Sequence, residues 1–192
     1  MSSIQIVSVV AVIAGSYFVG AIPFSLLVAK RYGVDLRKVG SGNIGSTNVS
    51  RVLGRRLGIF AFTLDVLKGL VPMLLAPRIW AAVDLGIGAD ASVGSTTLYW
   101  AWLGVAAACV FGHMFPIYLG FRGGKGVATS LGVLLGIWPY YTVPALICFA
   151  LWGAVFLLGR YVSVASIVAA GLFPVAYYVI GLWQQWDPAG HK

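Results

Sequence analysis

Long apolar runs constrain the fold of this chain more than any other feature of its sequence. One run covers residues 4–29, and another stays apolar from residue 127 to residue 159. Runs of 18 or more apolar residues are typical of helices that cross a bilayer. The chain is 60% hydrophobic and only 9% charged, whereas an ordinary soluble domain has about 25% charged residues. We therefore expect an integral membrane protein and exclude a soluble cytosolic enzyme.

Prolines and charged residues divide the apolar sequence into six expected spans. The run over 127–159 is longer than one span needs, and Trp138-Pro139 followed by Pro144 predicts a break into two helices, the first of them short. The sequence thus predicts an all-α polytopic membrane protein, with one integral membrane domain over residues 1–192. The six spans are expected at 4–29, 57–80, 96–117, two within 127–159, and 163–183.

The basic residues are distributed unevenly between the loops. Six spans place the loops 30–56, 118–126 and 160–163 on one face, and these carry ten of the 13 Lys and Arg residues. Because cytoplasmic loops are enriched in Lys and Arg, this face is expected in the cytoplasm and both termini outside it. In so apolar a chain the net charge of +8 indicates contact with membrane lipids rather than with nucleic acid.

The first basic loop contains a glycine-rich stretch that suits an anion. The stretch GSGNIGSTNVSR (40–51) matches the dinucleotide pattern GxGxxG, but that pattern has meaning only within a strand–helix–strand unit. Glycines still allow successive backbone N–H groups to converge on an anion. A simple turn is the alternative. The expected binding residues are Gly40, Ser41, Gly42, Asn43, Thr47, Asn48 and Arg51, the last with a planar fork suited to phosphate.

The second basic loop, FRGGKG (121–126), resembles a Walker A loop without completing it. Gly126 stands where Ser or Thr would bind magnesium. An anion there would still meet Lys125, the glycine N–H groups and the start of a helix expected near Val127. The alternative is an ordinary flexible cytoplasmic loop. The third stretch, residues 160–163, is a weak signal taken alone.

A few polar residues lie inside the expected spans. Asp65 and Lys68 are three residues apart on one helix face, and we expect them to pair with each other or with Arg from the loops. His113, near the end of the third span, is either a structural hydrogen-bonding group or a general base. The scattered acids and the two cysteines, Cys109 and Cys148, give no metal-ligand spacing. We expect neither a metal nor a cofactor.

Several segments resemble one known family. The motifs GSGNIGSTNVSRVLG (40–54), GHMFPIYLGFRGGKGVATSLG (112–132) and RYVSVASI (160–167), with DVLKG (65–69), closely resemble the bacterial acyl-phosphate:glycerol-3-phosphate acyltransferases, the PlsY family. The resemblance implies a multi-pass enzyme of the bacterial cytoplasmic (inner) membrane, with its active site facing the cytoplasm. Such an enzyme transfers a fatty acyl group from acyl phosphate to the sn-1 hydroxyl of glycerol 3-phosphate. The product is lysophosphatidic acid, a precursor in phospholipid biosynthesis.

On this hypothesis the loops supply the active site. The expected catalytic residues are Ser41, Arg51 and Lys125, with His113 or a substrate phosphate oxygen as proton acceptor. The expected substrate- and phosphate-binding residues are Gly40, Gly42, Asn43, Thr47, Asn48, Gly123, Gly124, Gly126 and Ser163.

One further expectation follows from the same resemblance. Family members usually have a seventh span followed by a His/Arg/Asn motif, whereas residues 184–192 are short and polar, so we expect either a truncated chain or a variant.

The alternative function is a transporter for an organic phosphate or another anion, and a membrane scaffold comes third. Both are less favoured, because the polar residues concentrate on one face and a scaffold leaves the glycine-rich loops unexplained.

Overall fold

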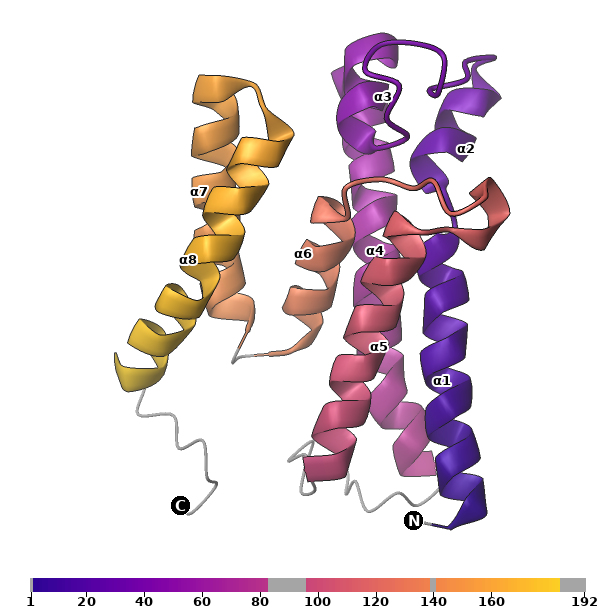
Figure 1. The fold of residues 1–192 in the computed structure, drawn as a ribbon, viewed down its shortest axis with the longest axis vertical. Coiled ribbons are helices and arrows are strands. Elements are labelled where there is room, and N and C mark those ends of the chain that lie inside the picture. The colour runs from indigo at the N-terminus through magenta and orange to yellow at the C-terminus, as the bar shows by residue number, and fades with distance from the viewer. Residues whose placement is uncertain (1, 83–95, 139–140, 184–192) are drawn as a thin grey trace. The chain divides into compact units, whose positions relative to one another are not determined.

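All the elements in the computed structural model are helices, and it describes residues 2–82, 96–138 and 141–183. The chain divides into two compact units, residues 1–136 and 137–192, which are described separately. The first unit contains α1 (Ser3–Ala21), α2 (Phe24–Arg31), α3 (Ser46–Leu53), α4 (Arg55–Ala82), α5 (Thr96–Met114), the 3₁₀ turn η1 (Ile117–Leu119) and α6 (Val127–Gly136) (Figure 1). The second contains α7 (Thr142–Gly159) and α8 (Val162–Trp183).

Within the part of the chain that the structure describes, five helical segments are long and apolar enough to cross a membrane, and the prediction of six spans is wrong on this point. The candidate spans are Ser3–Arg31, Arg55–Ala82, Leu98–Leu119, Thr142–Gly159 and Val162–Trp183. The sixth expected span, the first half of 127–159, is the 10-residue helix α6. A helix of that length rises about 15 Å, which is half of the roughly 30 Å hydrocarbon core. The expected break is confirmed, since α6 ends at Gly136 and α7 begins at Thr142; Pro139 lies outside the described residues.

The first apolar run is interrupted rather than continuous. Helix α1 ends at Ala21 and α2 begins at Phe24, with Pro23 at the junction. Proline has no N–H to donate and cannot continue a regular helical hydrogen-bond ladder. The helix is therefore interrupted within a segment that the hydropathy pattern alone predicts as one span.

Glycines allow the helices of the first unit to approach closely. A Cβ on Gly69 of α4 would overlap the Thr129 carbonyl oxygen of α6, and one on Gly132 of α6 would overlap the Val66 carbonyl oxygen of α4. Small residues at helix contacts are typical of membrane proteins, where packing rather than water exclusion drives association. These contacts fix α6 against α4.

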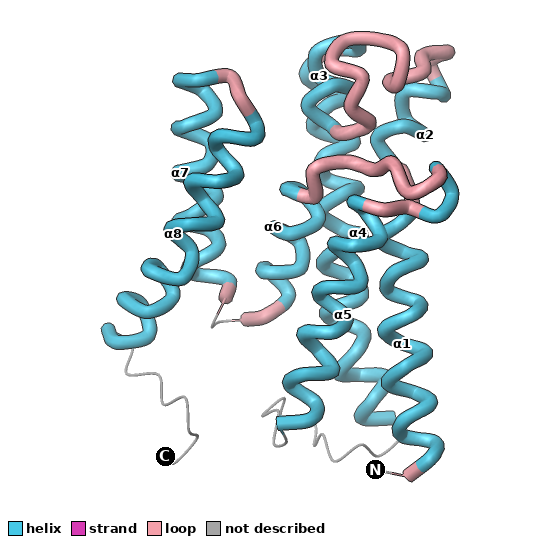
Figure 2. The backbone as a smooth tube through the Cα atoms, viewed as in Figure 1, coloured by secondary structure: helices cyan, strands magenta, loops and turns pink. Residues whose placement is uncertain are grey.

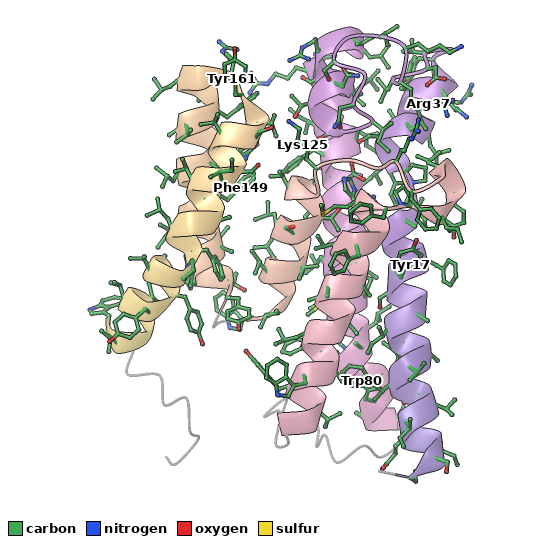
Figure 3. The ribbon with its side chains drawn as sticks, in the orientation of Figure 1. Tyr17, Arg37, Trp80, Lys125, Phe149 and Tyr161 are labelled. Carbon is green, nitrogen blue, oxygen red and sulfur yellow. The ribbon has the colours of Figure 1, made fainter. Side chains whose placement is uncertain are left out.

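The two glycine-rich loops lie toward the same end of the first unit. The loop regions 32–45 and 115–126 both lie away from the end where α1 begins (Figure 2). Trp80, which is only 1% exposed, lies far from the labelled Arg37 of the first loop, toward the opposite end of the unit (Figure 3). The polar loops and the aromatic core residue therefore mark opposite ends of the unit.

Candidate active site

A buried ion pair forms the centre of the polar end of the first unit. Lys68 Nζ lies 2.9 Å from Asp65 Oδ1, and the two residues are 4% and 2% exposed. Ser25 Oγ donates to Asp65 Oδ2 at 2.7 Å, and Lys68 Nζ donates to the Ile22 carbonyl at 2.8 Å. The expected pairing of the two charges is thus confirmed, with each other as partners. A buried pair is tolerated when further hydrogen bonds satisfy its polar atoms. Ser25 and the Ile22 carbonyl supply such bonds to Asp65 Oδ2 and Lys68 Nζ, while Asp65 Oδ1 faces the Lys68 ammonium with no hydrogen-bond partner among the described residues.

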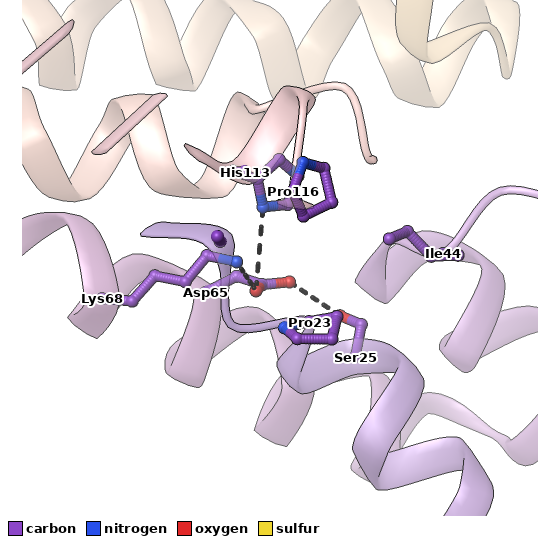
Figure 4. Close-up of a pocket in the computed structure, with 8 residues that line it drawn as sticks. Pro23, Ser25, Ile44, Asp65, Lys68, His113 and Pro116 are labelled. Atoms are coloured by element: carbon purple, nitrogen blue, oxygen red, sulfur yellow. Dashed lines mark hydrogen bonds and ion pairs between the residues drawn. The ribbon is translucent and has the colours of Figure 1, made fainter. Parts of the chain in front are cut away.

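Helix α5 brings His113 to this pair. His113 Nδ1 lies 3.9 Å from Asp65 Oδ1, beyond hydrogen-bond distance, and has no hydrogen-bond partner among the described residues. Figure 4 shows how His113, Asp65 and Lys68 face one another across a small pocket. The residues that line it are Ala21, Pro23, Ser25, Ile44, Asp65, Lys68, His113 and Pro116.

The second glycine-rich loop packs directly on His113. The Gly124 N–H donates to the His113 carbonyl at 3.2 Å, and the Gly123 N–H donates to the Met114 carbonyl at 3.0 Å. A Cβ on Gly123 would overlap the His113 carbonyl oxygen, and one on Gly124 would overlap the imidazole Nε2. The glycines are therefore required by close packing. Because both N–H groups are engaged within the protein, phosphate binding by Gly123 and Gly124 stays a prediction.

The end of this loop has the geometry expected from its sequence. Gly126 has φ +80°, in the left-handed region, and α6 begins at the next residue, Val127. Lys125 is exposed just before this helix start. A cation and a helix N-terminus thus lie together, and both attract anions.

The first glycine-rich loop is held together by one amide side chain. Asn48 is 2% exposed, and its Oδ1 accepts from the Ser41 N–H at 2.9 Å. Its Nδ2 lies within 3.2 Å of the carbonyl oxygens of Leu36, Val39 and Asn43. Asn48 therefore organises the loop, and its contact with a substrate stays a prediction.

The other candidates of the first loop are more accessible. Gly40 and Gly42 have φ of +62° and +70°, a conformation that glycine adopts without strain. Arg51 and Thr47 lie on α3, not in an extended loop. The exposed candidates in this region are Gly40, Ser41, Gly42 and Arg51, while Asn43 and Thr47 are half-buried.

Ser163 belongs to the second unit. It is exposed in the first turn of α8. Its participation in a site with the loops of the first unit stays a prediction.

An exposed ion pair lies in the loop that Asn48 holds together, between α2 and α3. Arg37 Nε and Nη2 donate to Asp35 Oδ1 and Oδ2 at 2.9 and 2.7 Å. These hydrogen bonds hold the pKa of the Asp35 carboxyl well below its usual range, and they raise the pKa of Arg37. Both charges are thus committed to each other.

Ser25 and the Ile22 carbonyl are site components that the sequence did not reveal. Ser25 is a single hydroxyl within an apolar run, two residues after Pro23. A polar residue beside a proline break in a span was the available signal, because such a break exposes backbone carbonyls to new partners.

Fold and site together define a multi-pass helical membrane protein with two glycine-rich, basic loops. These loops lie beside a buried polar cluster, which consists of Ser25, Asp65, Lys68 and His113. The family model described as glycerol-3-phosphate acyltransferase matches residues 10–189. The chain belongs to this family, and the resemblance identified from its motifs is confirmed.

Individual relatives agree with this assignment. The glycerol-3-phosphate acyltransferase of Trichlorobacter lovleyi is 46% identical over 166 residues, which cover 86% of this chain and 76% of that protein. The one from Aquifex aeolicus is 45% identical over 154 residues, covering 80% and 71%.

Solved structures are similar as well. A crystal structure of PlsY (YgiH), an integral membrane glycerol 3-phosphate acyltransferase in its glycerol 3-phosphate form, is 39% identical, with a TM-score of 0.71 and coverage of 94% of this chain and 80% of that one. The lysophosphatidic acid form is 40% identical, with a TM-score of 0.72 and coverage of 91% and 78%.

Proposed function

We propose that this protein transfers a fatty acyl group from acyl phosphate to the sn-1 hydroxyl of glycerol 3-phosphate, forming lysophosphatidic acid. The observation that carries the proposal is that the loop with Lys125 packs against His113 of the buried cluster. The chain that contains this loop matches the acyltransferase family over residues 10–189. The similar solved structures are of a glycerol 3-phosphate form and a lysophosphatidic acid form, which are the acceptor and the product of this reaction.

The exposed cations are suited to the two phosphate groups that the reaction brings together. Lys125, next to the N-terminus of α6, would hold one phosphate. Arg51 on α3, with Ser41, Asn43 and Thr47 close to it in sequence, would orient the other substrate. The remaining candidates, Gly40, Gly42, Asn48, Gly123, Gly124, Gly126 and Ser163, would shape the binding surfaces or contact substrate.

The chemistry requires neither a covalent enzyme intermediate nor a metal. The sn-1 oxygen attacks the acyl carbonyl carbon, a new C–O ester bond forms, and the bond to the phosphate oxygen breaks, releasing inorganic phosphate. The hydroxyl proton passes to His113 or to a substrate phosphate oxygen. Because acyl phosphate is already activated, positioning and charge stabilisation supply most of the acceleration.

The membrane placement belongs to the same proposal. Nine of the basic residues lie in 30–56 and 118–126, toward one end of the first unit. By the positive-inside tendency this end faces the cytoplasm of a bacterial inner membrane. The acyl chain would lie between helices, open to the lipid.

An acyl-transfer assay on purified protein in lipid vesicles tests the proposal. Palmitoyl phosphate and labelled glycerol 3-phosphate are the substrates, and palmitoyl-CoA is the control donor. We expect labelled lysophosphatidic acid only with palmitoyl phosphate. Counterflow of labelled glycerol 3-phosphate without any product would contradict the proposal and favour a transporter.

A further inference from the structure

We propose that His113 is a positioning residue for the loop that carries Lys125. This inference rests on the proposed function, because Lys125 is assigned a substrate phosphate there. It gives the buried cluster a role in the reaction without placing any of its members on the substrate. Three observations carry it: two contacts of His113 and the low exposure of its side chain.

The first observation is the contact between His113 and the glycines above it. The His113 carbonyl accepts from the Gly124 N–H at 3.2 Å, and the imidazole occupies the space that a side chain at 124 would need. Gly124 does not have a left-handed φ. Glycine at 124 is therefore required because His113 fills the neighbouring volume, and the backbone one residue before Lys125 rests on the ring.

The second observation is how the ring is supported on its other side. Nδ1 faces Asp65 Oδ1 at 3.9 Å, and Asp65 is itself held by Ser25, by Lys68 and, through its backbone carbonyl, by Thr129 Oγ1 at 3.2 Å. These partners come from α2, α4 and α6. His113 thus connects the other members of the buried cluster to the loop that carries Lys125.

The third observation is the small accessibility of the imidazole. The His113 side chain is 8% exposed, its Nδ1 faces the carboxylate, and its Nε2 faces the Gly124 backbone. A general base must come within hydrogen-bond reach of the proton that it removes. With both nitrogens facing protein, the contacts favour support of the loop, and a substrate phosphate oxygen then takes the proton.

A steric double-variant cycle tests the contact. We expect Gly124→Ala to lower kcat/KM by at least about 30-fold, because a displacement of about 1 Å in positioning groups costs up to about 100-fold. Adding His113→Ala removes the overlapping ring, so the double variant should be more active than Gly124→Ala alone. Gly15→Ala, where a Cβ meets nothing within 4 Å, is the matched control. A double variant that is no more active than Gly124→Ala alone overturns the proposal.

A conservative variant separates positioning from proton transfer. We expect His113→Gln to raise the KM of one phosphate substrate about 10-fold while kcat stays within about 3-fold. Loss of a general base would instead lower kcat by about 100-fold or more, with KM unchanged, and that result overturns the proposal.

Thermal unfolding keeps this test distinct from that of the proposed function. If the wild-type protein makes no lysophosphatidic acid, the proposed function fails. The contact is then tested by Tm alone: Gly124→Ala should lower Tm, and the addition of His113→Ala should restore part of the loss. Absence of that restoration refutes the contact independently of activity.

Discussion

Among the described residues, two Asp–cation pairs have similar N–O distances in very different surroundings. Asp65 and Lys68 are 2.9 Å apart with side chains 3% and 2% exposed, whereas Asp35 and Arg37 are 2.7 Å apart with side chains 25% and 53% exposed. Buried charges that lose a partner cannot be solvated by water, but exposed ones can. The N–O distance is therefore a poor indicator of how much either pair contributes to stability, and the burial of the two side chains is a better one.

The number of elements that each pair connects also differs. Arg37 contacts a residue only two positions away, so its pair closes a local turn. The Asp65–Lys68 pair lies on α4 and reaches Ser25 of α2 and the Ile22 carbonyl at the end of α1. The buried pair thus holds together helices that are distant in sequence.

Breaking the buried pair should have the largest effect. Lys68→Met leaves Asp65 without its cation, and we expect the free energy of unfolding to fall by about 3–5 kcal/mol. Thermal or denaturant unfolding of the protein in detergent or nanodiscs measures the change.

A second substitution tests the cause of that loss. In Asp65→Asn/Lys68→Met no charge remains buried, and the amide can still accept a hydrogen bond from Ser25. We expect this double variant to recover most of the stability. If it is as unstable as Lys68→Met, an unpaired buried charge is not the cause.

An exposed cation at the proposed site should affect activity but not stability. Lys125→Ala should lower kcat/KM by about 100-fold, because a charge that stabilises the transition state is lost, with Tm unchanged. The acyl-transfer assay measures this, with Lys30→Ala at the end of α2 as control. Normal turnover of Lys125→Ala would show that this cation does not contact a phosphate.

A smaller effect is expected where charge is kept and geometry is changed. Arg51→Lys retains the positive charge but loses the bidentate fork, so kcat/KM should fall about 10-fold. Arg55→Lys, four residues further along the chain at the start of α4, should be close to wild type. Equal losses in both variants would indicate a general charge effect.

The smallest effect is expected at the exposed pair. Arg37→Ala should lower Tm only slightly at pH 7, because an exposed ion pair adds little stability, and it should return the Asp35 pKa toward about 3.9, as measured by NMR titration. Because the folded-state pKa of Asp35 is lowered, the stability from this pair is present above the unfolded-state pKa. It is lost as the pH falls through the folded-state value. A large Tm change at pH 7 would contradict the proposed difference between the pairs.

The sequence predicted what depends on local pattern. The apolar runs located five of the six expected spans among the described residues, and the spacing of Asp65 and Lys68 predicted that they could pair with each other. The sequence predicted that the first helix of 127–159 is short but still counted it as a span, because a continuous apolar run does not show where a helix ends. Nor did it show that Gly123 and Gly124 lie against His113, a contact that depends on how the chain turns after α5.

Long-range partners were the least predictable part of the candidate site. Ser25 is 40 residues from Asp65 in sequence, and nothing in the local pattern connects them. The Ile22 carbonyl accepts from Lys68 beside the Pro23 break, which is a consequence of tertiary packing. The role of Asn48 is similar, since its residue type suits substrate binding as well as loop formation.

The hydrogen bonds of Asn48 have a consequence for dynamics. One side chain holds the Ser41 N–H and lies against three carbonyl groups between residues 36 and 43. The segment can therefore open only when the whole set separates, so its opening is cooperative rather than a gradual fraying. Deuterium uptake at the Ser41 amide reports that single event, and it gives the free energy needed to open the loop beside the proposed site.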